Sequence, residues 1–243
     1  MGRTVTRPVR HTALFAMATT FIVCFHPGAL AEGEHESGIT AATLFERVQQ
    51  ANAERAAALK AYLSTRRYSV FEPGHDPDAE LIVSMEYVAP STKTFRTIET
   101  RGVGWIDRRV FRQLMAAEQQ AASGKDRSDS AITSANYDAQ LLGSEPQGGR
   151  DCYVVALQPK RRDKYLFRGK AWIDKEDFGI ARLEGEPVKS PSFWVVKAPF
   201  VREYQRIGRF WLPLQDETHS QIRFAGEYVL RIHYADYQIT ATD

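Results

Sequence analysis

The sequence predicts an α+β fold, in which a strongly curved antiparallel β-sheet, a half-barrel, wraps over a long N-terminal helix and a short lid helix. Three observations lead to this prediction. Apolar residues recur at helical spacing between residues 44 and 63. From residue 132 onward, runs with a period of two follow one another across short turns, which favours antiparallel pairing. The apolar face of such a sheet needs a cover, and the two helices can supply it.

The first 31 residues have the three regions of a secretory signal peptide. Three arginines make the start basic, an apolar run covers residues 13–25, and Ala29-Leu30-Ala31 supplies small residues at a cleavage site. The apolar run is shorter than the roughly 20 residues that span a membrane, so an uncleaved anchor is the weaker alternative. We therefore expect cleavage after Ala31 and a soluble mature protein in the periplasm.

The charge of the mature chain gives no case for nucleic-acid binding. The signal segment takes three of the 32 basic residues and none of the 30 acidic ones, so the rest is close to neutral. Nucleic-acid binding depends on clustered Lys and Arg. The cluster Lys160-Arg161-Arg162 lies between two predicted strands and is better explained as a solvated hairpin tip than as a phosphate or lipid head-group site.

Two segments make up the mature chain. Residues 32–40 are acidic and small, without periodicity, which predicts a flexible leader. Residues 41–243 contain no repeat or Pro/Gly-rich linker and fit one domain, expected to be a monomer.

The first predicted element is an amphipathic helix of about five turns. Thr40 or Thr43 can cap its start. After Arg66 the period changes from helical to two, which predicts strands at 68–70, 81–87 and 92–100. The apolar and small positions of the helix are Leu44, Val48, Ala51, Leu59, Tyr62 and Leu63.

Residues 108–122 return to helical spacing, and the polar stretch 123–130 follows them. A short helix with a polar tether opens at low cost, so we expect a lid here. The later strands are predicted at 137–144, 153–157, 165–174, 180–184, 193–206 with an interruption at Pro199, 210–214, 218–224 and 228–239.

Three segments of the chain resemble the outer-membrane lipoprotein-sorting proteins, the LolA-like group with its LolA and LppX types of half-barrel. They are Trp172-Ile173-Asp174 with the acidic turn to Gly179 and Ile180-Ala181-Arg182, then Phe210-Trp211-Leu212-Pro213, then Ala235-Asp236-Tyr237-Gln238-Ile239. The order of export signal, helix, early strands, short helix and late meander is similar too. The resemblance implies an apolar interior that holds acyl chains of a lipid or lipidated protein, and transient donor or acceptor membrane proteins.

The sequence contains no recognisable catalytic or metal-binding constellation. His35-Glu36 lacks a second histidine at zinc spacing, and no Gly-x-Ser-x-Gly elbow or phosphate-binding glycine loop occurs. Asp76, Asp78 and Glu80 alternate along a turn but lack the later ligands of a calcium loop. Cys152 begins a strand, where a buried inert thiol is the common outcome. We therefore expect no cofactor and no enzyme, and a hydrolase with an unrecognised site ranks last.

Aromatic residues concentrate in the strand-rich half, where they either fill an ordinary core or line an open cavity. The second reading predicts a periplasmic carrier that binds acyl chains and moves them towards the outer membrane. The alternative is a periplasmic sensor or assembly module that binds a protein partner with the same fold. The candidate cavity-lining residues are Met85, Tyr87, Phe111, Leu114, Met115, Trp172, Phe193, Tyr204, Trp211 and Tyr228.

Overall fold

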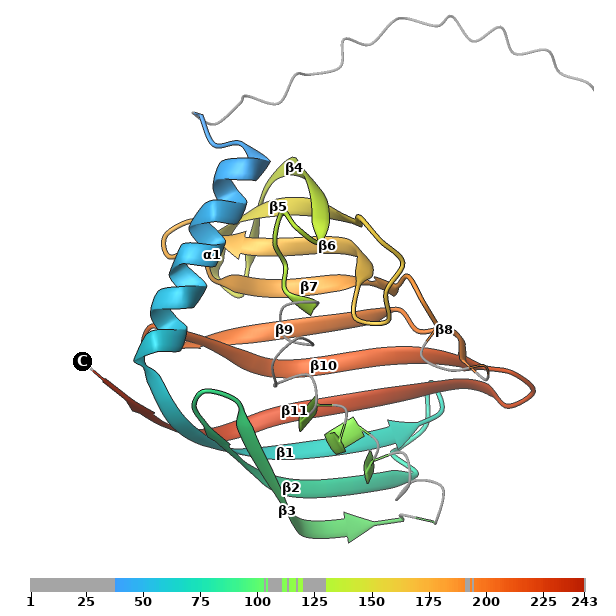
Figure 1. Cartoon of the computed structure of the whole chain (residues 1–243). Coiled ribbons are helices and arrows are strands. Elements are labelled where there is room, and N and C mark those ends of the chain that lie inside the picture. Colours follow the sequence, from blue (N-terminus) through green and yellow to red (C-terminus); the bar gives the residue numbers. More distant parts are fainter. Residues whose placement is uncertain are drawn as a thin grey trace, which may run out of the picture. The chain divides into compact units, whose positions relative to one another are not determined.

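The computed structural model describes residues 38–102, 104, 111–112, 114–116, 118–119, 130–190, 193 and 195–242. The predicted signal peptide, most of the predicted leader, and residues 123–129 of the predicted tether lie outside them. The described part contains helix α1, a short helical segment at the described positions of 111–119, and an eleven-stranded sheet (Figure 1). Helix α1 is Ala41–Ala58, and the strands are β1 Leu59–Phe71, β2 Ala79–Val88, β3 Thr92–Arg101, β4 Tyr137–Gln147, β5 Arg150–Pro159, β6 Phe167–Asp174, β7 Ile180–Pro187, β8 Val195–Lys197, β9 Phe200–Ile207, β10 Phe210–Ile222 and β11 Gly226–Ala241.

Helix α1 starts where a threonine side chain can cap it. The Thr40 hydroxyl accepts a hydrogen bond from the backbone N–H of Thr43 at 3.1 Å, which satisfies one of the free donors of the first turn. The predicted cap is therefore confirmed. The helix buries one stripe of its surface, formed by Leu44, Phe45 and Val48.

The predicted end of this helix was wrong, because residues 59–63 belong to strand β1. Along β1 the buried positions recur with a period of two, at Tyr62, Ser64, Arg66 and Tyr68. Two of these four side chains are polar, so the sequence showed no apolar alternation. Leu59, Tyr62 and Leu63 meanwhile continued the helical spacing of α1 by coincidence.

The strands form one open antiparallel sheet in the order β3-β2-β1-β11-β10-β9-β7-β6-β5-β4, with β8 paired to β10. Most consecutive strands are neighbours, as the predicted meander requires. Strands β3 and β4 instead lie at opposite edges of the sheet, and β7 pairs with β9 because β8 pairs with β10. The pairing of β1 with β11 joins the first three strands to the last eight. The predicted fold class, a curved antiparallel half-barrel with helices on it, is confirmed (Figure 1).

Two other strand predictions concern β8, β9 and β10. The interruption at Pro199 is confirmed, since β8 ends at Lys197 and β9 begins at Phe200. The division into strands at 210–214 and 218–224 was wrong, because β10 runs through both. A register shift between Pro213 and Gln215 accommodates the proline, which has no N–H to donate to the ladder.

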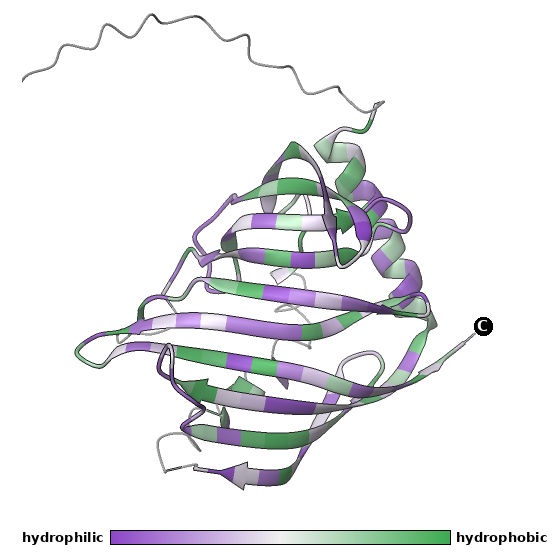
Figure 2. Ribbon diagram, turned by 180° about the vertical axis from the view of Figure 1, so that it is seen from behind, coloured by the Kyte–Doolittle hydropathy of each residue, from purple (hydrophilic) through white to green (hydrophobic). Residues whose placement is uncertain are grey.

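The buried core is divided along the sheet. Helix α1 covers β4 to β7, where Leu44 packs with Tyr137 and Ile173 in one cluster. The short helical segment covers β1 and β2, where Phe111 packs against Tyr68 in a second cluster. Hydrophilic and hydrophobic residues are mixed along β9, β10 and β11, the strands between these clusters (Figure 2). A third buried cluster there includes Met85 of β2 and Phe210 and Leu212 of β10. The middle of the half-barrel therefore combines polar and apolar residues.

Candidate functional site

A cavity of about 560 Å³ lies between β1, β2, β10 and β11 and the short helical segment. Its volume falls within the range of roughly 300–1,000 Å³ that is usual for small-molecule sites. Leu59, Leu212 and Ile232 supply aliphatic wall from three strands, and Leu114 adds to it from the helical segment. These side chains make one part of the cavity suitable for hydrocarbon.

Tyrosines form another part of the cavity wall. Tyr62, Tyr68, Tyr87 and Tyr234 line it from β1, β2 and β11. Burial raises the pKa of Tyr62 to about 12 and that of Tyr234 well above its usual value, so both hydroxyls stay protonated at neutral pH. The Tyr234 hydroxyl donates a hydrogen bond to Asp216 Oδ2 at 2.9 Å.

A first group of charges links the short helical segment to the sheet. Glu118 accepts from Arg66 of β1, and its other oxygen accepts from Lys93 Nζ of β3 at 2.7 Å. The Arg66 side chain is only 2% exposed, and its guanidinium lies 5.4 Å from the ring centre of Phe95 and 5.0 Å from that of Tyr234. Burial alone would raise the pKa of Glu118, but Arg66 and Lys93 outweigh it and lower that pKa. The carboxylate is therefore ionised.

A second ion pair also lies at the cavity. Arg202 Nε of β9 donates to Asp216 Oδ1 of β10 at 2.6 Å, and both residues line the cavity. The Asp216 carboxylate thus has two donors, Arg202 and Tyr234. The cavity combines aliphatic walls with charged groups that are already hydrogen-bonded.

The structure brings some of the predicted lining residues together and separates others. Tyr87 and Leu114 line the cavity. Met85 and Phe111 are fully buried beside it, and Met115 packs partly buried against the Phe111 cluster. For all five, a part in ligand binding stays a prediction.

The two predicted tryptophans lie on the other face of the sheet. Ala171 and Ile173 belong to the cluster under α1, and neighbouring side chains of a strand point to opposite faces, so Trp172 points away from that cluster. Trp172 and Trp211 pack together with Cys152 instead.

The remaining three lie at other places. Tyr204 packs against the cluster under α1. The Phe193 side chain is 72% exposed, and the Tyr228 hydroxyl lies 3.4 Å from Glu72 Oε1 at the far end of β11. Their part in binding also stays a prediction.

The charged residues at the cavity are not evident from the sequence. Arg66, Lys93, Arg202 and Asp216 all lie within strands, where isolated charges are normally taken as solvent-facing. One signal was available, because Arg66 shares the period of two with Tyr62 and Tyr68 on β1. A charged residue in register with aromatic neighbours can indicate a buried polar site.

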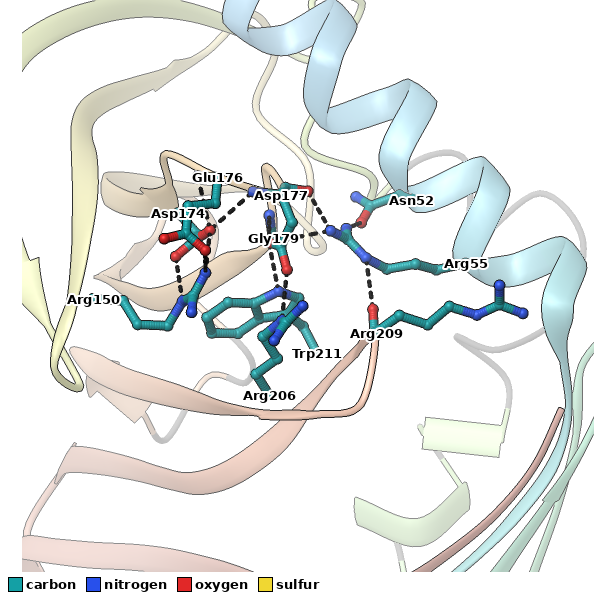
Figure 3. A network of polar contacts seen from close by, with 10 residues as sticks. All are labelled: Asn52, Arg55, Arg150, Asp174, Glu176, Asp177, Gly179, Arg206, Arg209 and Trp211. Atoms are coloured by element: carbon teal, nitrogen blue, oxygen red, sulfur yellow. Dashed lines mark hydrogen bonds and ion pairs between the residues drawn. The ribbon is translucent and has the colours of Figure 1, made fainter. Parts of the chain in front are cut away.

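The acidic turn that carries the family resemblance forms a separate polar network (Figure 3). Asp174, at the end of β6, has a side chain only 1% exposed. It accepts two hydrogen bonds from Arg150, and the backbone N–H groups of Glu176 and Asp177 donate to it at 3.0 and 2.9 Å. This carboxylate therefore holds the turn closed.

Asp177, at the other side of the same turn, connects it to α1 and to β9 and β10 (Figure 3). Trp211 Nε1 and Arg206 Nε donate to its carboxylate at 2.9 and 2.8 Å, and Arg55 of α1 lies 3.3 Å from it. A Cβ atom on Gly179 would lie 2.0 Å from Trp211 Nε1, so the indole needs a glycine there. The motif fixes the end of α1 to the sheet, away from the cavity.

Other chemistry finds little support in the part of the chain that the structure describes. No group of three or more His, Cys, Asp or Glu side chains is placed there to hold a metal ion. Cys152 is buried, and burial together with Asp174 raises its pKa to about 11, so the thiol stays protonated. None of the described helices is both long and apolar enough to span a membrane.

The chain belongs to a protein family whose model carries the description "uncharacterized protein" and matches residues 119–243. No curated protein matches the chain. Among solved structures, a LolA superfamily protein from Nitrosomonas europaea matches with 13% identity and a TM-score of 0.38, over 85% of this chain and 96% of that one.

Two further structures match with slightly lower sequence identity. A putative outer membrane lipoprotein-sorting protein domain from Vibrio parahaemolyticus has 12% identity and a TM-score of 0.40, over 81% of this chain and 92% of that one. The Pseudomonas aeruginosa MucA/MucB complex matches with 10% identity and a TM-score of 0.29, over 83% and 99%. By name, the Vibrio domain belongs to the lipoprotein-sorting group that the sequence resembles. At these identities and TM-scores the similarity carries no information on function.

Proposed function

We propose that this chain is a periplasmic carrier, without catalytic activity, that binds an acyl chain of a lipid or lipidated protein and moves it towards the outer membrane. The observation that carries the proposal is the cavity of about 560 Å³ with aliphatic walls inside the half-barrel. The signal peptide expected from residues 1–31 supports the compartment.

The cavity offers hydrocarbon contacts from several elements. An acyl chain there would contact Leu59, Leu212 and Ile232 on the sheet and Leu114 on the helical segment. Burial of each methylene contributes about 0.8 kcal/mol, so a chain of about fourteen carbons gains roughly 10 kcal/mol before ordering costs. Such binding needs no reacting group, and release needs the helical segment to move away.

A variant that fills the cavity tests this proposal. Leu114→Trp places an indole in the cavity, and we expect it to reduce binding of the neutral fluorescent probe N-phenyl-1-naphthylamine at least tenfold, because the probe needs the same space. The measurement is probe fluorescence on delipidated protein.

The matched control is Leu142→Trp, since Leu142 is 49% exposed on β4 and lies outside the cavity. The control should bind the probe like the unmodified chain. Absence of probe binding to the unmodified chain, or equal binding by Leu114→Trp, would refute the carrier proposal.

A second candidate function, a module that binds a protein partner, is favoured by one observation. Phe224 is 97% exposed at the turn between β10 and β11, with a φ of 63° that is rare for an aromatic residue. Arg223 Nε donates to the carbonyl of Phe193, which brings a second exposed ring to this tip. An exposed apolar patch of this kind is typical of a contact surface.

A further inference from the structure

Three polar side chains on the inner face of β1 lack hydrogen-bond partners. Ser64 Oγ, Arg66 Nε and Tyr68 OH are buried, and within the described residues none of them has a hydrogen bond of good geometry. The Arg66 guanidinium is nevertheless close enough to Tyr68 to oppose the effect of burial, which raises the pKa of that hydroxyl. The three residues are 3%, 1% and 1% exposed. Buried polar groups are normally satisfied, because leaving one unpaired destabilises the folded chain.

These groups lie at the edge of the cavity. Tyr68 lines it directly, and Ser64 and Arg66 follow it at the same period of two on the same face of β1. Arg66 and Lys93 both bond to Glu118, which lines the cavity too. The unpaired atoms and the charged groups therefore belong to one wall, which we call the β1–β3 wall. It consists of Ser64, Arg66 and Tyr68 of β1, Lys93 of β3 and Glu118 of the helical segment.

Among the described residues at this wall of the cavity, positive charges outnumber negative charges, and some hydrogen-bond donors have no acceptor. In the part of the chain that the structure describes, the charged side chains that line the cavity are Lys93, Arg202, Glu118 and Asp216. Arg66, which is buried and bonded to Glu118, adds a third cation next to them. Each carboxylate already accepts from two donors. One positive charge is thus left over, and the free groups are an N–H and two hydroxyls, all able to donate.

We infer that the β1–β3 wall binds the anionic head, a carboxylate or a phosphate, of an amphiphile whose hydrocarbon tail occupies the aliphatic part of the cavity. This inference rests on the proposed function and names the chemical class of its ligand. A cationic head would add to the excess charge. A neutral head could accept hydrogen bonds from the free donors but would leave the excess charge unbalanced. An anion accepts hydrogen bonds from Lys93 and from Tyr68 and balances the charge.

Glu118 pairs with the two cations that would bind the anionic head. The carboxylate of Glu118 occupies the position that faces Arg66 and Lys93, so it competes with an anionic ligand for the same donors. Loss of the Glu118 charge should therefore strengthen the binding of an anion, whereas a purely structural role of this ion pair predicts no such gain.

The experiment compares two ligands with the same tail. Tetradecanoate and tetradecanol are titrated against delipidated protein loaded with N-phenyl-1-naphthylamine, and inorganic phosphate is a third titrant. We expect tetradecanoate to displace the probe at a concentration at least tenfold lower than tetradecanol does, because a charge-assisted hydrogen bond is worth about a factor of ten or more. Phosphate alone should not displace the probe, since it lacks the tail.

Four variants assign the preference to the wall. Lys93→Met should abolish it and Tyr68→Phe should reduce it, while Glu118→Gln should increase it. Lys170→Met is the matched control, because Lys170 is a partly exposed lysine of β6 outside this cavity, and it should leave the preference unchanged. Circular dichroism checks that each variant is folded.

The outcomes separate the two proposals. If tetradecanoate and tetradecanol displace the probe equally well, the inference of an anionic head is wrong and the carrier proposal stands. The same conclusion follows if the preference for tetradecanoate survives in Lys93→Met and does not increase in Glu118→Gln. If phosphate alone displaces the probe, the β1–β3 wall binds a free anion, and the inference that its ligand is an amphiphile is wrong. A chain that never binds the probe fails the carrier proposal itself.

Discussion

Replacing Asp174 by alanine should lower the free energy of unfolding by about 3 kcal/mol. The Asp174 carboxylate is almost completely buried and accepts from Arg150 and from two backbone N–H groups of the turn to Gly179. Its loss leaves these donors without their acceptor and loosens the turn that Asp177 ties to α1. The measurement is urea unfolding at pH 7, followed by tryptophan fluorescence.

The control is Glu176→Ala in the same turn. The Glu176 side chain is 79% exposed and also contacts Arg150, so its loss should cost less than 1 kcal/mol. A loss for Asp174→Ala as small as that of the control would show that the turn does not depend on the buried carboxylate.

The same residue gives a pH dependence with a defined sign. Burial alone would raise the pKa of Asp174, but Arg150 and the backbone N–H groups outweigh it and the pKa is lowered. A lowered pKa in the folded state means that the stabilisation is complete above the unfolded pKa of about 3.9 and is lost as the pH falls through the folded value. As the pH falls from about 4 towards 2, the free energy of unfolding should therefore decrease less in Asp174→Ala than in the unmodified chain.

A second large effect is expected at Glu118. Glu118→Ala leaves the buried guanidinium of Arg66 with Lys93 beside it and no carboxylate, which should destabilise the fold by about 3 kcal/mol. The double variant Arg66→Met with Glu118→Leu should recover most of this loss, because an apolar pair of similar size often replaces a buried ion pair without cost. Urea unfolding of both variants measures the difference.

An exposed ion pair serves as the control for this experiment. Glu99 pairs with Arg101 on β3, and both side chains are more than 40% exposed, so Glu99→Ala should change stability by less than 1 kcal/mol. Equal stability of Glu118→Ala and the double variant would contradict the interpretation that an unpaired buried charge causes the loss.

Most of the sheet could be predicted because its strands alternate in a simple way. On β2, Leu81, Val83 and Met85 are apolar, two residues apart and buried, as expected. On β1 the alternating buried residues include the polar Ser64 and Arg66, so the sequence pattern predicts helix for the first half of this strand. The pairing of β1 with β11 joins segments at opposite ends of the domain, and no local pattern indicates such a contact.

The site could be predicted only in its apolar part. Tyr87 and Leu114 were found because aromatic and aliphatic residues at regular spacing mark an inner face. Arg66 and Glu118 were not, since each is stabilised by a partner 52 residues away in the sequence. The role of a buried charged residue can be inferred only when its partner is known, and the partner is known only from the folded structure.

The central claim, that the cavity holds an acyl amphiphile, is tested most directly by what the protein carries from the cell. The measurement is mass spectrometry of the organic extract of mature protein purified from a bacterial periplasm, with a secreted protein of similar size as control. We predict one acyl lipid with a carboxylate or phosphate per protein molecule, absent from the control and depleted in Leu114→Trp. An extract as free of lipid as the control would contradict the claim and favour the module that binds a protein partner.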